Sequence, residues 1–243
     1  MNIESYKIQL GQLPVLVRRR PIKNLHLAIL PPDGLIRVSA PVHMSDEAIR
    51  MLLAMRIPWI NKQRAKFQGQ TRQAPRKYVS GESHYFWGQR YILEVVNDNK
   101  PMSVSLKGKK KIILQVPAKS TIKKRDEVMS EWYREELRQE ADKLIKKWEP
   151  KIGVTVRQFG IKKMKTRWGT CNHKAGRVWL NLELAKKPVD FTEYVVVHEL
   201  LHLIEKNHSE RFVKLLSNYL PKWRSLKAEL NRFILSHEEW RNI

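Results

Sequence analysis

The stretch VVVHELLHLIEKNHSERF, from Val195 to Phe212, places three histidines and three glutamates in a mostly apolar helical pattern. Apolar helix faces normally exclude ionisable groups, so their presence needs a reason. On an α-helix, residues four apart lie one turn apart and differ in direction by about 40°. His198 and His202 can therefore point toward one ion, while Glu199 is displaced around the helix and can reach a water there.

A catalytic zinc site has three protein ligands and one open position. His208 is our candidate for the third ligand, because Asn207 suits the left-handed residue that ends a helix and lets the chain fold back. Glu205 and Glu210 are alternative ligands. We expect one zinc ion per chain, with Glu199 as the general base that takes a proton from water. The competing interpretation is a set of core or helix-end histidines beside solvated glutamates.

The neighbouring residues predict where this helix and the next ones begin. Asp190 is expected to N-cap the motif helix, and Glu193 completes a capping-box pattern. Ser209 is expected to cap a following helix, and Pro221 to begin the last one.

Upstream of the motif, the apolar residues alternate as in strands. Such segments lie within 6–42, where Pro-Asp-Gly predicts a turn, and within 84–117. Between them, Ser45 is expected to cap a helix that is interrupted near Pro58. No internal repeat is evident in the sequence.

After residue 117 the apolar period changes from two to 3.6, which predicts one long helix ended by Pro150. Strands are then expected between 154 and 184. We therefore predict an α+β protein with an N-terminal β-rich subdomain at 1–117, containing one helix, and a catalytic domain at 118–243.

The charge of the chain is unusually positive, +23 at pH 7. Two blocks carry the excess: residues 1–117 contain 20 lysines and arginines against 7 acids, and residues 151–187 contain 10 against 1. Such surfaces attract nucleotides, nucleic acids or anionic proteins, and the alternative is a merely solvated cationic surface. No apolar run is long enough to cross a membrane, and no signal peptide is evident. Cys171 is the single cysteine, which also fits the cytoplasm.

The chain contains TRWGTC (166–171), WLNLEL (179–184) and HELLHLIEKNHSERF (198–212). In these stretches it resembles the YgjP-like metallopeptidases, which are related to the SprT-like and WLM zinc proteases. A looser similarity covers RRRPIKNLHLAILPPDGLIRVSAP and IPWINKQ near the N-terminus.

The resemblance implies a gluzincin-like core, in which a small antiparallel sheet lies over the HExxH helix. It implies that His198, His202 and His208 bind zinc and that Glu199 is the general base. It further implies that an edge strand holds an extended peptide by backbone pairing. The strand with the candidate substrate-binding residues would border the cleft: Arg167, Trp168 and Gly169.

A zinc-dependent metallopeptidase acting on a peptide or protein is therefore the leading hypothesis. Some members of the family imply an alternative, a metal-dependent nucleoside triphosphate (UTP) pyrophosphatase. The WLM relatives imply another, a nucleic-acid-associated protease. The basic residues of 151–187 would suit phosphate, with Lys162, Lys163, Lys165 and Arg167 as candidates, but no glycine-rich phosphate cradle is visible.

Each remaining candidate residue has a structural interpretation as well as a functional one. Arg167 could steady an oxyanion or a phosphate, or be solvated. Trp168 could line the cleft, but a core position is favoured, and Gly169 is expected to meet a tight backbone need. Cys171 is expected to be a small buried group rather than a reactive thiol. The other histidines are expected to be structural or at the surface: His26, His43, His84, His173 and His237.

Overall fold

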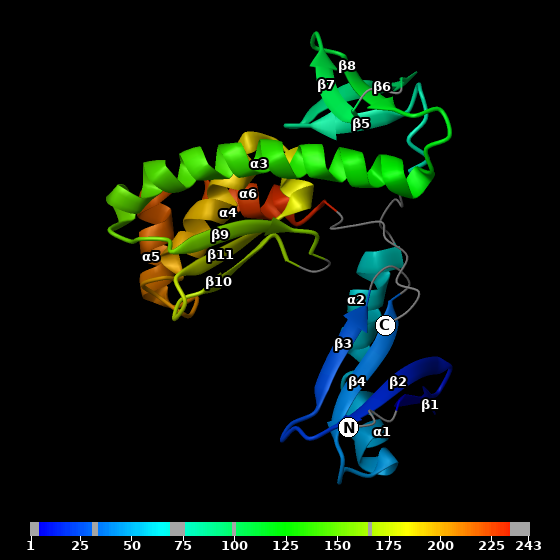
Figure 1. Ribbon diagram of the computed structural model, residues 1–243. Coiled ribbons are helices and arrows are strands. Elements are labelled where there is room, and N and C mark those ends of the chain that lie inside the picture. Colours follow the sequence, from blue (N-terminus) through cyan, green and yellow to red (C-terminus); the bar gives the residue numbers. More distant parts are fainter. Residues whose placement is uncertain (1–4, 31–33, 69–75, 99–100, 165–166, 234–243) are drawn as a thin grey trace. The chain divides into compact units, whose positions relative to one another are not determined.

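The computed structural model describes residues 5–30, 34–68, 76–98, 101–164 and 167–233. The chain divides between Pro75 and Arg76 into two compact units, and the second unit spans Arg76–Ser236 (Figure 1). Both units combine sheets with helices, so the α+β prediction is confirmed. Lys165 and His237 lie outside the described residues, as does most of the Pro-Asp-Gly turn.

The first unit contains a four-stranded sheet in the order β1-β2-β4-β3. Its strands are β1 (Ser5–Leu10), β2 (Leu13–Arg20), β3 (His26–Leu30) and β4 (Leu35–Pro41). Strands β2 and β4 pair in parallel, whereas the other pairs are antiparallel. Buried residues alternate with more exposed ones along β2 and β4, so one face of the sheet lies on a core.

Two helices cover that face, α1 (Asp46–Ala54) and α2 (Ile57–Gln68) (Figure 1). The predicted cap is present, because the Ser45 hydroxyl accepts a hydrogen bond of 3.2 Å from the backbone N–H of Ala48. Ile49, Leu53 and Ile60 are fully buried in this core. The predicted interruption falls just before α2, whose first turn tolerates Pro58.

The second unit begins with a sheet of the same topology. Its strands are β5 (Ser83–Phe86), β6 (Gln89–Asn97), β7 (Ser103–Lys107) and β8 (Lys111–Val116), in the order β5-β6-β8-β7. The middle pair, β6 and β8, is again parallel. The two sheets thus share one strand order and one set of pair directions. The sequence shows no repeat because topology does not require similar residues at matching positions.

The long helix α3 (Ile122–Ile152) packs on this sheet and on the helices and strands that follow it in the chain. The prediction that Pro150 ends it was wrong, because the helix continues to Ile152 and ends at Gly153, which has a left-handed φ of 76°. The N–H of Gly153 bonds to the carbonyl of Glu149 at 2.9 Å. Burial of Ile152 in the core offsets the cost of a proline in the last turn.

A three-stranded sheet follows, with β9 (Gln158–Lys162), β10 (Gly169–Asn172) and β11 (Arg177–Asn181) in the order β10-β11-β9. We expected an antiparallel sheet, but β9 pairs with β11 in parallel and only β10 with β11 is antiparallel. Strands β9 and β10 therefore lie on opposite sides of β11, and β10 is an edge strand of the described sheet.

The 3₁₀ helix η1 (Leu182–Lys186) leads into α4 (Val189–Leu201), followed by α5 (Glu210–Tyr219) and α6 (Trp223–Leu230). The predicted caps of α4 were wrong at both ends. Pro188 occupies the N-cap position, and His202 is the C-cap. The carboxylate of Glu193 accepts hydrogen bonds from Trp148 and Lys147 of α3, so a tertiary contact replaces the expected capping box.

The division between the units differs from the expected boundary at residue 117. Buried residues of the second sheet, such as Phe86, Leu93 and Leu114, share one core with α3 and α4. The change of period at residue 117 marks a change from strand to helix rather than the end of a core. Among the described helices, none combines the length and the apolar character that crossing a bilayer would require.

Candidate metal centre

Three histidine side chains converge at the C-terminal end of α4. His198 lies in the last turn of the helix, His202 is its C-cap, and His208 directly precedes Ser209, the N-cap of α5. The Nε2 atom of His208 lies 3.0 Å from Nε2 of His198 and 3.1 Å from Nε2 of His202. The chain turns back between the two helices because the carbonyl of Leu201 accepts from the N–H of Glu205 at 2.9 Å.

The spacing of these nitrogens fits a tetrahedral metal ion. Two ligands at the usual Zn–N distance of about 2.0–2.1 Å, separated by a tetrahedral angle, lie about 3.3 Å apart. The observed separations are close to that value, and all three ligand atoms lie within 4.8 Å of one another. The side chains present therefore fit a zinc ion with a fourth position open. In the described residues this histidine group contains neither Glu205 nor Glu210, the alternative ligands.

A backbone carbonyl fixes the orientation of one ring. Nδ1 of His202 lies 3.0 Å from the carbonyl oxygen of Glu205, which can only accept a hydrogen bond. The proton of the neutral ring is therefore on Nδ1, and the lone pair on Nε2 faces the other histidines. This is the tautomer that a metal ligand needs. Glu205 thus contributes its main chain rather than its carboxylate.

Phe212 forms the floor of the cluster. Its ring stacks on His202 at a centroid distance of 4.7 Å and meets His198 and His208 edge-on at 5.0 and 4.9 Å. The side chain is 1% exposed, so the three imidazoles rest on the apolar core through it. Phe212 was not singled out from the sequence, because its contact with all three rings depends on the turn before α5.

The cluster favours neutral imidazoles. Burial, followed by the neighbouring His202 and His208, lowers the pKa of His198 to about 3. Burial also lowers the pKa of His208, with His202 and Lys227 as further causes. A metal ligand must be neutral, so the surroundings hold the rings of His198 and His208 in the ligating state at pH 7.

Glu199 is a buried carboxylate, only 6% exposed. Burial raises its pKa to about 8, against a lowering by the positive charge of Arg167. Arg167 itself is exposed and follows directly on the part of the loop that the structure leaves undescribed. With a pKa near 8 this group is mostly protonated at pH 7, and a cation held by the histidines would favour the ionised carboxylate that a general base needs.

Gly169, the first residue of β10, lies against Glu199. A Cβ built on Gly169 would lie 2.7 Å from Oε1 of Glu199 and 2.8 Å from a methyl carbon of Val195. Real Cβ atoms do not approach other atoms so closely, so only glycine fits. The tight backbone need expected for this glycine is a need for space beside the glutamate.

One known protein family accounts for most of the chain. The model of the YgjP-like family, described as a metallopeptidase domain, matches residues 23–233. The chain belongs to the YgjP-like family. The metallopeptidase assignment of this YgjP-like chain thus covers both the histidine cluster and the strand with Gly169. No curated protein matches the chain. Among solved structures, the metallopeptidase zymogen of Pyrococcus abyssi abylysin is similar, with 18% identity and a TM-score of 0.35 over 37% of this chain and 90% of its own.

The YgjP-like chain holds β10 in place through Asn181, a residue that the sequence did not single out. Asn181 is fully buried at the end of β11. Its Nδ2 donates to the carbonyls of Met164 and Arg167 at 2.8 and 2.7 Å, and its Oδ1 accepts from the N–H of Glu183 at 3.2 Å. One side chain therefore ties both ends of the loop before Gly169 to the sheet.

The backbone of β10 is oriented for pairing at its outer edge. The N–H of Asn181 donates to the carbonyl of Trp168 at 2.9 Å, so these two residues form a hydrogen-bonded pair. Such pairs alternate along an antiparallel ladder. The main-chain polar groups of Gly169 and Cys171 therefore point away from β11, toward the edge of the described sheet.

The other candidate residues have internal roles. Trp168 is partly buried and packs against the core, as the favoured interpretation held. Burial, and then the charge of Glu199, raises the pKa of the Cys171 thiol to about 11, so this thiol stays neutral at pH 7. Lys162 lies over the ring of Trp179 at 3.6 Å, and Lys163 pairs with Asp126 at 3.1 Å. Two cations proposed for phosphate binding are thus engaged within the protein.

Proposed function

We propose that this YgjP-like chain is a zinc-dependent peptidase. The observation that supports it best is the convergence of three Nε2 atoms beside a buried carboxylate, next to an edge strand with outward backbone groups. His198, His202 and His208 would hold the ion. A zinc ion there would supply the Lewis acid that acidifies water and polarises a carbonyl group.

Glu199 would act as the general base. Its carboxylate would take a proton from the attacking water and return it to the leaving amine. This exchange needs a pKa of Glu199 close to the working pH. Burial raises the pKa of Glu199 above its ordinary value, and a nearby cation would bring it back toward the working pH. Arg167, whose charge is felt by Glu199, would stabilise the negative oxygen that develops on the carbonyl carbon.

The peptide would bind by adding a strand to β10. Gly169 and Cys171 offer donors and acceptors to an extended backbone, while the missing side chain at Gly169 lets that backbone come close to Glu199. This mode of binding contacts the backbone of the substrate rather than its side chains. We therefore expect modest sequence preference and no hydrolysis of tightly folded substrates. Trp168 would contribute through its backbone position rather than as an exposed wall.

The pyrophosphatase alternative stays a prediction with weaker support. It needs cations to hold a triphosphate, and Lys162 and Lys163 have partners within the protein. The nucleic-acid-associated protease also stays a prediction. It would need a surface that binds nucleic acid in addition to the metal centre. The cytoplasmic location likewise stays a prediction, supported by the single cysteine.

The decisive experiment compares the wild type with Glu199→Gln. Both proteins are assayed against a peptide library and against nucleoside triphosphates with phosphate detection, and their zinc content is measured. We expect the wild type to cleave peptides, and Glu199→Gln to keep zinc but lose that cleavage. Glu210→Gln makes the same chemical change at an exposed position and should behave as wild type. Phosphate release that depends on Glu199, without peptide cleavage, would establish the alternative.

A further inference from the structure

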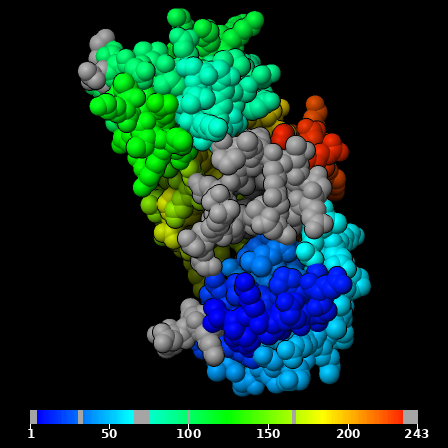
Figure 2. All heavy atoms as spheres, turned by 90° about the vertical axis from the view of Figure 1, so that its right-hand side faces the viewer, coloured from blue at the N-terminus to red at the C-terminus, as the bar shows by residue number. Residues whose placement is uncertain are grey.

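A row of large apolar residues lies on the outer side of α1 and α2. Met51 and Met55 are 69% and 68% exposed, Trp59 is 43% exposed and Leu52 is 36% exposed. Only residues 55 and 56 separate the two helices, and Met51, Met55 and Trp59 follow one another at intervals of four, the spacing of neighbours on one side of a helix. We call these four residues the outward row. Figure 2 shows α1 and α2, in light blue and cyan, at the surface of the first unit.

The core of the first unit does not need this row. Its helices already bury Ile49, Leu53 and Ile60 against the sheet. Met51 is two positions from both Ile49 and Leu53, or about 200° around a helix, so its side chain points away from the core. Surface helices normally carry polar residues on that side. Single exposed apolar residues are ordinary, but a row of four on neighbouring turns is typical of an interaction site, where methionine adapts well to a partner.

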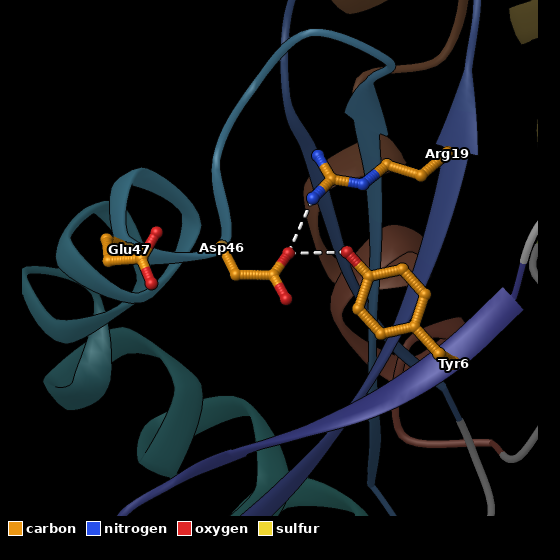
Figure 3. A pocket seen from close by; sticks show the side chains of 4 residues that line it. All are labelled: Tyr6, Arg19, Asp46 and Glu47. Carbon is orange, nitrogen blue, oxygen red and sulfur yellow. Dashed lines mark hydrogen bonds and ion pairs between the residues drawn. The ribbon is translucent and has the colours of Figure 1, made fainter.

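Two acidic residues begin α1, and one of them is used inside the first unit. The carboxylate of Asp46 accepts hydrogen bonds from the hydroxyl of Tyr6 and the guanidinium of Arg19 (Figure 3). These three side chains line a shallow pocket together with Glu47. The side chain of Glu47 is 81% exposed, and Arg50 lies 3.9 Å from its carboxylate. Asp46 therefore stabilises the fold, whereas Glu47 is an exposed acid one turn before the outward row begins.

The other charges beside the outward row are positive. Arg50, Arg56 and Lys62 are exposed, and α2 contains no aspartate or glutamate. Within the described part of the chain, the side chains of Arg56 and Lys62 form no hydrogen bond or ion pair. An occupant that complements this surface needs apolar side chains, a net negative charge and a polar group that tolerates Glu47 at one end.

We propose that the outward row binds an amphipathic protein segment whose apolar residues are flanked by aspartate and glutamate. As a helix, such a segment would lay its apolar side along the row, with its carboxylates beside Arg56 and Lys62. Four side chains offer less than the surface of about 800 Å² that each partner contributes to a standard interface. The complex is therefore transient, with a Kd in the micromolar range.

Charge and residue type favour this partner over three others. A second copy of the chain would bring the same net positive surface against the row. An anionic membrane surface or a nucleic acid presents one sign of charge throughout, and it would repel Glu47, which is on the same side of α1 as Met51. Nucleic acid would also leave the methionines without an apolar partner, since bases stack on aromatic rings and the row offers one, Trp59. A protein segment can match both signs of charge and the apolar row together.

This inference does not depend on the proposed hydrolysis, because the outward row is in the first unit and the histidine cluster is in the second. The test measures binding of a fluorescein-labelled peptide to the full chain by fluorescence anisotropy. The peptide has about 18 residues, with leucines on one side of the helix and glutamates on the other. The protein carries Glu199→Gln, so that hydrolysis cannot consume the probe.

We expect micromolar binding that depends on both parts of the surface. Adding Met51→Gln/Met55→Gln keeps side chains of similar length but removes two apolar ones, and should raise the Kd at least about tenfold. Adding Arg56→Gln/Lys62→Gln should raise the Kd about threefold at 50 mM salt and less at 200 mM, because salt screens exposed charges. A peptide with lysine in place of every glutamate should bind at least about tenfold more weakly.

The matched control is Leu106→Gln/Ile122→Gln, which exchanges two exposed apolar residues of the second unit and should bind as the parent protein does. Thermal melting checks that each variant is folded. The proposal is overturned if the peptide does not bind, if the methionine variant keeps the parental Kd, or if a peptide with its leucines scattered around the helix binds equally well.

Three further outcomes would replace the proposed partner by another. Tighter binding to phosphatidylserine vesicles would assign the row to a membrane surface, and tighter binding to a fluorescent oligonucleotide would assign it to nucleic acid. Dimerisation in analytical ultracentrifugation that is lost in Met51→Gln/Met55→Gln would assign it to a second copy of the chain. Each of these results overturns the proposal.

Discussion

A Cβ on Gly169 would lie 2.7 Å from a carboxylate oxygen of Glu199, so β10 lies directly on the residue proposed as the general base. The motif helix and the edge strand are distant in sequence, yet they meet where the chemistry would occur. An enzyme that hydrolyses an extended backbone needs this closeness, because the base must reach water beside a bond held by the strand.

Gly169→Ala should therefore impair hydrolysis without removing the metal. The added methyl group displaces either β10 or the carboxylate by several tenths of an ångström, and such shifts in an active site are costly. We expect kcat to fall by about tenfold or more, with zinc content unchanged, in steady-state peptide assays. Thr170→Ala, next on the same strand, is the control. Full activity of Gly169→Ala would show that the contact has no role in turnover.

Metal removal should destabilise the second unit and be reversed by zinc. The folded protein presents three converging ligands that the unfolded chain lacks, so zinc at about 1,000 times its Kd adds about 4 kcal/mol of stability. We expect one zinc per chain by elemental analysis, and a lower thermal midpoint after chelation. His208→Ala should weaken zinc binding by more than about 100-fold, the upper end of the loss from an outer-shell change. His43→Ala, at an exposed position, should bind zinc normally; equal zinc affinity in both variants would remove His208 from the site.

The part of the site that the sequence predicted is the part that helix geometry fixes. His198 and His202 are one turn apart on any helix, so their shared direction follows from spacing alone. His202 keeps near-helical backbone angles as a C-cap, so the argument holds although the helix ends earlier than expected.

The unpredicted features all depend on tertiary partners. Asn181 bonds to carbonyls of a loop whose path is set by the parallel pairing of β9 and β11. Glu193 leaves its expected cap because Trp148 and Lys147 lie within reach of its carboxylate. Local propensity cannot anticipate such contacts, since it ranks conformations of a segment without its neighbours.

Asn181→Ala should lower both stability and turnover. It leaves the carbonyls of Met164 and Arg167 without their donor in a partly buried place, which costs about 1–3 kcal/mol in urea unfolding. The loop before Gly169 loses its tether, so kcat/KM for peptides should fall although no ligand is touched. Asn172→Ala, which removes one hydrogen bond in an exposed turn, is the matched control. Unchanged kcat/KM in a destabilised Asn181→Ala protein would limit this residue to folding.

His84 should make the second unit less stable in mild acid. The side chain is 3% exposed, its Nε2 has no hydrogen bond, and the Glu82 carboxylate is 3.5 Å away. Burial, and then Arg76, lowers the pKa of His84 to about 4, although Glu82 raises it. Between pH 6.5 and 4 the unfolded chain binds a proton there that the folded chain does not. Stability is therefore complete above pH 6.5 and falls as the pH drops toward 4.

The size of this effect follows from the shift in pKa. Lowering the pH from 7 to 5 should cost about 2 kcal/mol through His84, at about 1.4 kcal/mol per pH unit below 6.5. His84→Gln stays neutral, so its free energy of unfolding should change by that much less between the two pH values, in urea titrations followed by tryptophan fluorescence. His43→Gln removes an exposed histidine and should retain the wild-type dependence. The three histidines of the metal centre are common to all these proteins, so their contribution cancels in the comparison. If wild type and His84→Gln lose equal stability, the buried ring accepts its proton as easily as a solvated one.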